Sequence, residues 1–163
     1  MLIRYGNIAI GDRLTDNSRD PDDYRYHDVF HMAYAVFLGW SPVTRALLKV
    51  KRKSDPLVDE AEDGARAIAV EEAVSALVFA RAKTSRHFEG VDQLDYDLLK
   101  TIESVVRGLE VARVPTWQWE TAILEGFRIF RDLRRARGGR VSWNLDHRTI
   151  TWQPPGGVDR AHP

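Results

Sequence analysis

The sequence contains no cysteine, carries no net charge and has no long apolar run. Without cysteine, neither a disulfide framework nor a thiolate metal site is possible, so any metal must be held by His, Asp or Glu. The 24 basic and 24 acidic residues balance, so there is no overall field to attract a nucleic acid or a membrane surface. Because the apolar stretches are also too short for a signal peptide or a membrane span, we expect a cytoplasmic protein.

Several common functional motifs are also missing. The chain has no glycine-rich phosphate loop, no nucleophile elbow and no dinucleotide fingerprint, so any nucleotide chemistry must use another arrangement of residues. The length of 163 residues suits one domain with a real core. We expect a single helical domain over residues 1–153 and a flexible tail over 154–163, which is polar and rich in Pro and Gly.

Helical periodicity and capping residues predict a mainly α fold, a bundle of about five helices. Asp20-Pro21 and Ser41-Pro42 have the cap-then-proline pattern of a helix start, and Gly138-Gly139 ends the last helix. The predicted helices cover approximately residues 21–39, 41–53, 59–83, 95–110 and 115–135.

Alternating apolar residues predict a short β-hairpin at each end of the bundle. The first hairpin, over 2–10, turns at Gly6-Asn7, and the second, over 140–153, turns at 146–148. We expect the two hairpins to pair with each other.

One face of the first predicted helix carries a polar stripe. His27, Asp28 and His31 follow Tyr24 at helical spacing, so all four can converge on one ligand. His31 is the only strongly polar residue in the run VFHMAYAVFLGW. Two imidazoles four residues apart with a carboxylate beside them suit a metal ion, whereas the plainer interpretation is a hydrogen-bonded core histidine.

Two adjacent acids, Glu71 and Glu72, are the only acidic residues in the apolar run AIAVEEAVSALVFARA. Adjacent helix positions point about 100° apart, so at least one of these carboxylates faces apolar surroundings. A buried carboxylate needs a cation, a metal or a protonated His as its partner.

A second acidic cluster lies one helix turn earlier, at Asp59, Glu60, Glu62 and Asp63. Carboxylates one or two turns apart can hold Mg²⁺, with Mn²⁺ as an alternative, and we predict Glu62, Asp63, Glu71 and Glu72 as the metal ligands. For Asp59 and Glu60 we prefer a simple role at the positive end of the helix dipole.

Basic residues that could bind phosphate precede and follow this cluster. We predict Lys51, Arg52, Lys53 and Arg66 as contacts to the phosphates of a nucleotide. The alternative is a solvated, lysine-rich helix end.

The segments YRYHDVFHMAYAVFLGWSPVTRALLKVKRKSDP and VDEAEDGARAIAVEEAVSALVF resemble the MazG-like proteins, specifically the helical region found C-terminal in nucleoside triphosphate pyrophosphohydrolases of that group. The similarity extends over approximately residues 20–131, through LDYDLLKTIESVVRGLEV and WETAILEGFRIFRDL. It covers whole segments and does not depend on one diagnostic motif.

The resemblance implies a helical, often oligomeric enzyme that uses Mg²⁺ and acidic helix residues to cleave a nucleotide between the α and β phosphates. The catalytic helices of that family carry ExxE and later ExxD. Here Glu60 pairs at that spacing with Asp63, whereas Glu71 and Glu72 are followed at that spacing by Val74 and Ser75. The pattern is half met.

The sequence therefore predicts a Mg²⁺-dependent nucleotide pyrophosphohydrolase or a closely related nucleotide-binding domain. His27, Asp28, His31 and Glu72 are the predicted catalytic residues, acting as base, water-orienting groups or further ligands. We expect a nucleotide substrate and a homo-oligomer. The alternative is a non-catalytic regulatory or interaction module that accompanies a MazG-type catalytic domain. The His27-Asp28 pair is also similar to HD-type phosphohydrolases, whose further metal ligands have no match here.

Overall fold

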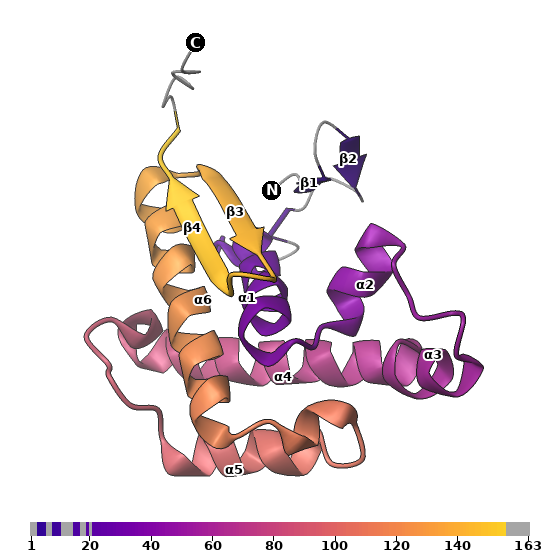
Figure 1. The fold of residues 1–163 in the computed structure, drawn as a ribbon. Helices are drawn as coiled ribbons and strands as arrows, with labels where there is room; N and C mark the ends of the chain where they lie inside the picture. Colours follow the sequence, from indigo (N-terminus) through magenta and orange to yellow (C-terminus); the bar gives the residue numbers. More distant parts are fainter. Residues whose placement is uncertain (1–2, 6–7, 11–14, 17–18, 20, 156–163) are drawn as a thin grey trace.

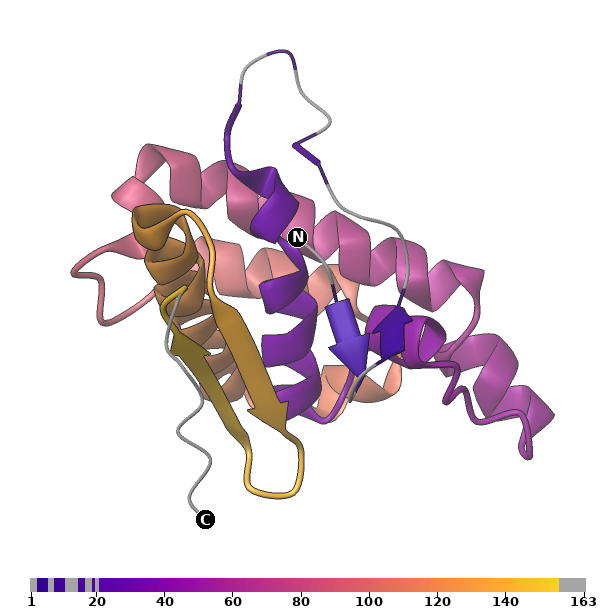
Figure 2. The same ribbon diagram turned by 90° about the horizontal axis from the view of Figure 1, so that it is seen from above.

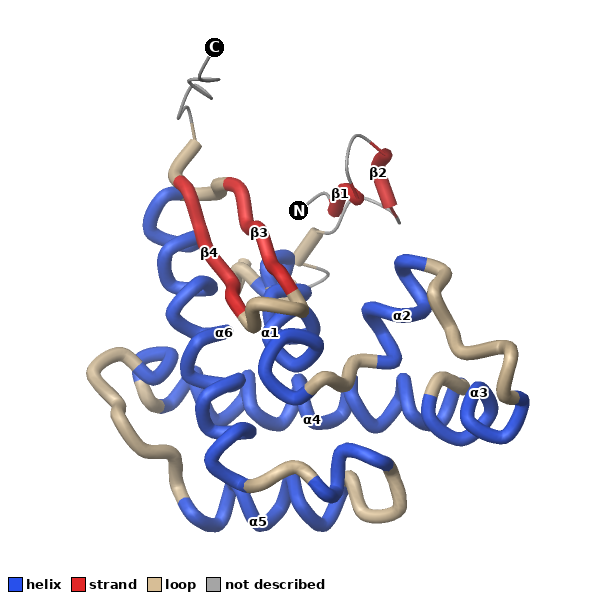
Figure 3. The backbone as a smooth tube through the Cα atoms, in the orientation of Figure 1, coloured by secondary structure: helices blue, strands red, loops and turns tan. Residues whose placement is uncertain are grey.

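The computed structural model describes residues 3–5, 8–10, 15–16, 19 and 21–155. Within these residues the fold is mainly α, as the sequence predicts (Figure 3). The α-helices are α1 (Asp28–Leu38), α2 (Pro42–Leu48), α3 (Pro56–Glu62), α4 (Ala65–Thr84), α5 (Tyr96–Val105) and α6 (Thr116–Ala136). Three short 3-10 turns accompany them: η1 (Tyr24–Tyr26), η2 (Arg86–Phe88) and η3 (Glu110–Arg113).

Four of the predicted helices differ from the observed ones. The second ends at Leu48 instead of residue 53, and the fourth ends at Val105 instead of residue 110. The first begins at Asp28 instead of residue 21, because Asp23 adopts a left-handed backbone (φ 63°) and η1 intervenes. The third is two helices, α3 and α4, which are separated at Asp63 and Gly64. A β-carbon on Gly64 would lie 2.2 Å from the carbonyl oxygen of Glu60, so the junction between α3 and α4 requires glycine.

The capping residues explain where the shorter helices start. Ser41 accepts a hydrogen bond from the backbone N–H of Thr44 (3.0 Å), and Pro42 occupies the first turn of α2. Asp55 performs the same role for α3 by accepting from Val58. These caps fix where α2 and α3 begin, and the loop over residues 49–55 connects the two helices.

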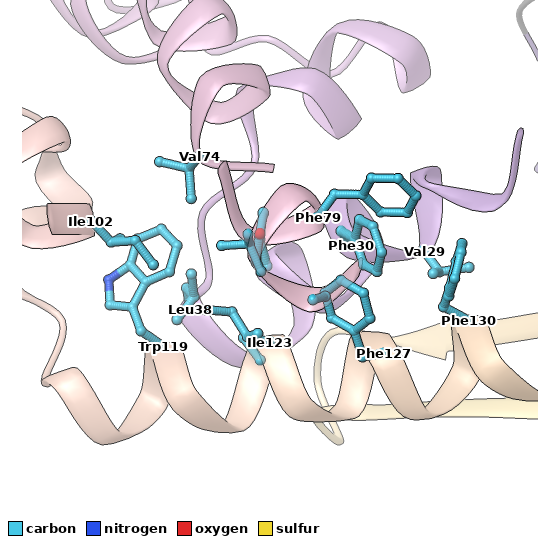
Figure 4. Packing of buried hydrophobic residues seen from close by; sticks show 14 of the residues in the cluster. Val29, Phe30, Leu38, Val74, Phe79, Ile102, Trp119, Ile123, Phe127 and Phe130 are labelled. Carbon is cyan, nitrogen blue, oxygen red and sulfur yellow. The ribbon is translucent and has the colours of Figure 1, made fainter. Parts of the chain in front are cut away.

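The core forms where α1 packs along α6 above the long helix α4 (Figure 1). Gly126 allows this close approach, since a β-carbon there would lie 3.2 Å from the ring of Phe30 and 3.4 Å from Ala33. Phe30 stacks on Phe127 with ring centroids 4.4 Å apart, and Phe79 of α4 packs edge-on against Phe130 (Figure 4). Aromatic packing therefore joins the three helices.

The C-terminal hairpin that the sequence predicts over 140–153 is present. Strands β3 (Arg140–Asn144) and β4 (Thr149–Gln153) are antiparallel, with Trp143 opposite Ile150. The hairpin lies over α1 and α6, where Ile150 is buried (Figure 2). It therefore closes one side of the bundle.

The N-terminal strands β1 (Ile3–Tyr5) and β2 (Ile8–Ile10) are antiparallel, with Ile3 opposite Ile10. The rest of the hairpin predicted over 2–10, at residue 2 and at the turn 6–7, lies outside the described residues. The prediction that the two hairpins pair with each other is wrong, because β1–β2 and β3–β4 are separate two-stranded sheets.

The predicted tail lies mainly outside the described residues, since 156–163 are not described. The single domain over 1–153 stays a prediction. No helix in the described part of the chain has both the length and the apolar character needed to cross a membrane.

We predict that Gly64→Ala lowers the free energy of unfolding by about 1–3 kcal/mol, because the new methyl group meets a backbone carbonyl that cannot rotate away. Urea unfolding followed by circular dichroism measures this loss. Gly126→Ala is the matched control: its contacts are to side chains, and alanine is favoured inside a helix by about 1 kcal/mol, so we expect a smaller change. Equal stability of Gly64→Ala and the wild type would contradict this account.

Candidate functional site

A cluster of two histidines and one aspartate forms where η1 meets α1. His27, Asp28 and His31 each offer one ligand atom, and these atoms lie within 4.8 Å of one another. The side chain of His31 is 1% exposed and those of Asp28 and His27 are 9% and 13% exposed. Polar groups buried this deeply need hydrogen-bond partners, so the partners of each ring nitrogen and carboxylate oxygen decide which atoms can bind a ligand.

Both imidazoles are held through their Nδ1 atoms. His27 Nδ1 lies 2.9 Å from the carbonyl oxygen of Tyr24, and since a carbonyl can only accept, this nitrogen carries the hydrogen. His31 Nδ1 lies 2.8 Å from Glu71 Oε1, and it donates to that carboxylate. The Nε2 atoms are the positions at which a metal would bind, because the Nδ1 atoms of metal-binding histidines are usually engaged in this way.

The two Nε2 atoms face the same region as Asp28. His27 Nε2 lies 3.3 Å from Asp28 Oδ1. His31 Nε2 is buried and has no hydrogen-bond partner in the described residues; Glu72 Oε1 lies 3.5 Å away. The ring of Tyr24 stacks on His27, with centroids 4.3 Å apart, and covers one side of the cluster.

Glu71 is the buried carboxylate that the sequence pattern predicts, and its side chain is 0% exposed. It accepts hydrogen bonds from His31 Nδ1 (2.8 Å), Ser41 Oγ (2.6 Å) and the backbone N–H of Val43 (2.8 Å). These donors come from α1, from the loop after it and from α2. Glu71 therefore ties α4 to both neighbouring helices, and both of its oxygens are in use.

The charge of His31 is set by the two glutamates. Burial alone would lower the pKa of His31, but the hydrogen bond to Glu71 and the nearby charge of Glu72 outweigh burial and raise the pKa to about 10. Without a metal, His31 is therefore protonated at neutral pH, and an ion at its Nε2 must displace that proton. Glu72 is more open, with 43% of its side chain exposed. The close approach of His31, at 3.5 Å, lowers the pKa of Glu72, so this carboxylate is charged at neutral pH.

Burial has opposite effects on the other two members of the cluster. It lowers the pKa of His27, although the charge of Asp28 acts in the other direction. It raises the pKa of Asp28, against the influence of His27 and His31. His27 is therefore neutral at physiological pH, which is the form that binds a metal.

A small crevice opens beside this cluster. It has a volume of about 10 Å³ and is lined by Asp28, His31 and Trp143, together with Met32, Thr44, Leu47 and Leu48. This is room for about one water molecule or ion. The hairpin β3–β4 contributes Trp143 and so limits access from this side.

The predicted carboxylate ligands do not lie together as free groups. Asp63 is 0% exposed and is bound by two arginines: its Oδ1 lies 3.0 Å from Arg45 Nη1 and 2.9 Å from Arg52 Nη2. Glu62 Oε2 accepts from the backbone N–H of Glu110 (3.0 Å). Together with Glu71, these predicted ligands already have protein donors.

The predicted phosphate contacts are similarly divided. Arg52 donates to Asp63 and also to Glu110, at 3.0 and 2.9 Å. Lys51 is half-buried, whereas Lys53 and Arg66 are exposed. The prediction that these four residues bind phosphate stays a prediction.

Sequence reasoning missed several of the partners in these networks. Arg45 and Glu110 complete the ion-pair network around Asp63, and Val43 supplies a backbone N–H to Glu71. Ser41 was expected only as a helix cap. No local pattern indicates these roles, because each contact joins residues 18 to 65 positions apart.

Among known families, the model of the MazG C-terminal domain matches residues 1–156 of the chain. The chain belongs to the MazG C-terminal domain family. The resemblance stated from residues 20–131 is confirmed. No curated protein and no solved structure matches the chain.

The MazG C-terminal domain described here thus contains two polar networks joined by α2. One is the Glu71 network with the His27, Asp28 and His31 cluster, and the other is the Asp63 network with its two arginines. The first keeps the Nε2 atom of His27 and a carboxylate available to a ligand, with that of His31 available once its proton is displaced, whereas in the second Asp63 is fully paired.

For Asp63 we predict a stability effect that disappears in acid. Burial alone would raise the pKa of Asp63, but hydrogen bonds from Arg52 and the charges of Arg45 and Arg52 lower it to about 2. A lowered pKa stabilises the fold above the unfolded value of 3.8, and the effect is lost as the pH falls through about 2. Asp63→Asn should therefore cost about 2 kcal/mol at pH 7 and progressively less between pH 4 and pH 2. Denaturant titrations across this range measure the difference, and a pH-independent cost would contradict it.

We also predict that Glu71→Ala destabilises the fold by about 3–5 kcal/mol, because it leaves the donors of His31, Ser41 and Val43 buried without an acceptor. Thermal and urea unfolding of the metal-free protein measure this cost. Glu72→Ala is the matched control on the adjacent, half-exposed position and should cost less than about 1 kcal/mol. Similar losses for the two variants would rule out the central role of Glu71.

Proposed function

We propose that this domain binds a divalent transition-metal ion through His27, Asp28 and His31, and that it uses the ion in the hydrolysis of a nucleotide phosphoanhydride. The observation that carries the proposal is the Nδ1 engagement of both imidazoles, by the Tyr24 carbonyl and by Glu71. It leaves the two Nε2 atoms unengaged by these partners, in a group whose ligand atoms lie within 4.8 Å of one another. His27, Asp28 and His31 would hold an ion after small side-chain movements and loss of the His31 Nε2 proton.

The donor set indicates which metal to expect. Two imidazoles with a carboxylate suit Mn²⁺, Fe²⁺ or Zn²⁺, whereas Mg²⁺ prefers oxygen ligands and retains several waters. The Mg²⁺ expected from the sequence relied on Glu62, Asp63, Glu71 and Glu72, of which Glu62, Asp63 and Glu71 are engaged by protein donors. We therefore favour Mn²⁺, the alternative ion of the sequence prediction.

The residues of the site would divide the work of hydrolysis. A bound divalent ion supplies Lewis acidity and lowers the pKa of a water molecule. Glu71 and the Tyr24 carbonyl hold the two imidazoles in orientation, at 2.8 and 2.9 Å. Glu72, charged and 43% exposed, lies at the open edge of the cluster and can accept a proton from the attacking water.

The position of the substrate follows from the space available. The crevice beside Asp28 and His31 holds about one water molecule, so it excludes a nucleotide. The substrate must approach from the side of Glu72 and His27, the more exposed members of the site. The choice of a nucleotide rests on the family resemblance, which also implies a homo-oligomer.

A second candidate function is a non-catalytic module that accompanies a MazG-type catalytic domain. It is favoured by the engagement of Glu71 and Asp63 in structural networks, and by Val74 and Ser75 in place of acids three residues after Glu71 and Glu72. In this case the His-Asp cluster binds a metal for structure or regulation. The two functions differ in whether phosphate is released.

The test combines metal binding with turnover. We expect the metal-stripped protein to bind Mn²⁺ with a stoichiometry of one, measured by calorimetry and by electron paramagnetic resonance, and His27→Gln to weaken binding about 10- to 100-fold. We expect wild type with Mn²⁺ to release pyrophosphate from at least one member of a panel of NTPs and dNTPs. Glu72→Gln should lower kcat without abolishing Mn²⁺ binding.

The matched control is His147→Gln, which alters an exposed histidine in the hairpin loop and should change neither property. Mn²⁺ binding without any phosphate or pyrophosphate release supports the non-catalytic module. Absence of Mn²⁺, Zn²⁺ and Fe²⁺ binding, or equal binding by His27→Gln, rejects the metal site.

A further inference from the structure

A second polar pocket lies at the C-terminal part of α6, next to the turn η2. It has a volume of about 290 Å³. Its lining consists of four arginines, one histidine and two acids: Arg86, Arg131, Arg134, Arg135, His87, Asp23 and Glu89. We call it the arginine pocket. It includes none of the His27, Asp28 and His31 cluster.

The arginine pocket has more positive than negative charge. Four guanidinium groups face two carboxylates, which leaves two positive charges in excess. Asp23 pairs with Arg134 at 2.8 Å but is shared with Arg25, also at 2.8 Å. Glu89 lies 3.7 Å from Arg135, and both side chains are mostly exposed; Asp132, outside the lining, lies 3.5 Å from the same arginine. The carboxylates therefore neutralise the arginines only in part.

Arg131 is the most informative member of the pocket. It is half-buried, and its Nη1 donates to the backbone carbonyl of His87 at 2.6 Å. No carboxylate in the described part of the chain lies within ion-pair distance of it. Burial lowers the pKa of Arg131, and the charges of Arg128 and Arg135 add to this effect despite Glu89 and Asp132. A partly buried guanidinium without a carboxylate partner is suited to an incoming anion.

The backbone beside Arg131 adopts an unusual conformation. Arg86, His87 and Phe88 have φ values of 49°, 56° and 57°, three consecutive left-handed residues without a glycine. Such residues are rare and concentrate at functional positions. Phe88 anchors the turn in the core, where its ring packs edge-on against Phe127 at 5.1 Å. The turn places Arg86 and the ring of His87 at the pocket.

The helix dipole explains only part of this arrangement. Arg134 and Arg135 lie in the last turn of α6, where cations are favourable. Arg86 comes from a different segment, and Arg131 is one turn further from the helix end. Residues from two separate segments thus supply positive charge to one concave site.

We infer that the arginine pocket binds the phosphoryl group of a small phosphorylated molecule. A phosphate monoester carries a charge of about −1.5 to −2 near pH 7, which matches the excess charge of the pocket. The planar guanidinium groups can donate paired hydrogen bonds to its oxygens. The volume of about 290 Å³ accommodates a phosphoryl group with a small organic part. This binding does not depend on the proposed metal site.

The experiment uses the metal-stripped full chain in a phosphate-free buffer, with inorganic phosphate, pyrophosphate and a nucleoside monophosphate as probes. Calorimetry and ³¹P line broadening measure the dissociation constants. We expect Arg131→Gln and Arg86→Gln to weaken binding about 10- to 100-fold. Arg86 is exposed, so Arg86→Gln separates a loss of binding from a loss of folding.

Arg128→Gln is the matched control. Arg128 lies on the same helix but pairs with Glu125 at 2.9 Å and does not line the pocket, so its substitution should leave binding unchanged. Similar affinity for inorganic phosphate and the monoester means that the phosphoryl group alone is recognised, and tighter binding of the monoester means that its organic part adds contacts. Absence of binding by all three probes, or equal losses in Arg86→Gln and Arg128→Gln, overturns the inference. Retained binding in His27→Gln keeps the result separate from the metal site.

Discussion

The carboxylate of Glu71 is the constraint on which the rest of the structure depends. It is buried inside the bundle, and an unpaired charge there would be strongly unfavourable. Its three donors come from α1, from the following loop and from α2, so satisfying the charge fixes how these segments meet α4. The same contacts orient His31, and through His31 they position Glu72. One buried acid therefore links the packing of the bundle to the geometry of the candidate site.

The ionisable groups lie at three places that differ in how completely other protein groups pair with them. Around Asp63, arginine and carboxylate side chains satisfy one another, and this network joins α2, the end of α3 and η3. At His27 and His31, protein groups hold the Nδ1 atoms by hydrogen bonds, whereas the Nε2 atoms have only the longer contacts to Asp28 (3.3 Å) and Glu72 (3.5 Å). In the arginine pocket, the carboxylates are fewer than the guanidinium groups. A bound ligand stabilises the incompletely paired sites most, because it supplies the hydrogen-bond and charge partners that the protein lacks there.

Membership in the MazG C-terminal domain family and the proposed chemistry rest on different observations. The family is shown by the match over residues 1–156. The proposed metal site depends on local geometry, and it uses a His-Asp set instead of paired acidic motifs. Two of the four carboxylates predicted as metal ligands, Glu71 and Asp63, already have at least three protein donors each.

The sequence by itself determined the mainly α class, the C-terminal hairpin, the caps at Ser41 and the burial of one glutamate in the run around Glu71. These features follow from periodicity, capping and the cost of burying charge, which act over a few residues. The break at Gly64, the late start of α1, the separate hairpins and the partners of Glu71 and Asp63 were decided only by the tertiary structure. These features depend on contacts between residues far apart in the sequence, such as the hydrogen bonds that Arg45 and Arg52 donate to Asp63. Residue spacing along one helix sets which side chains share a face, but packing between helices decides which partner each of them finds.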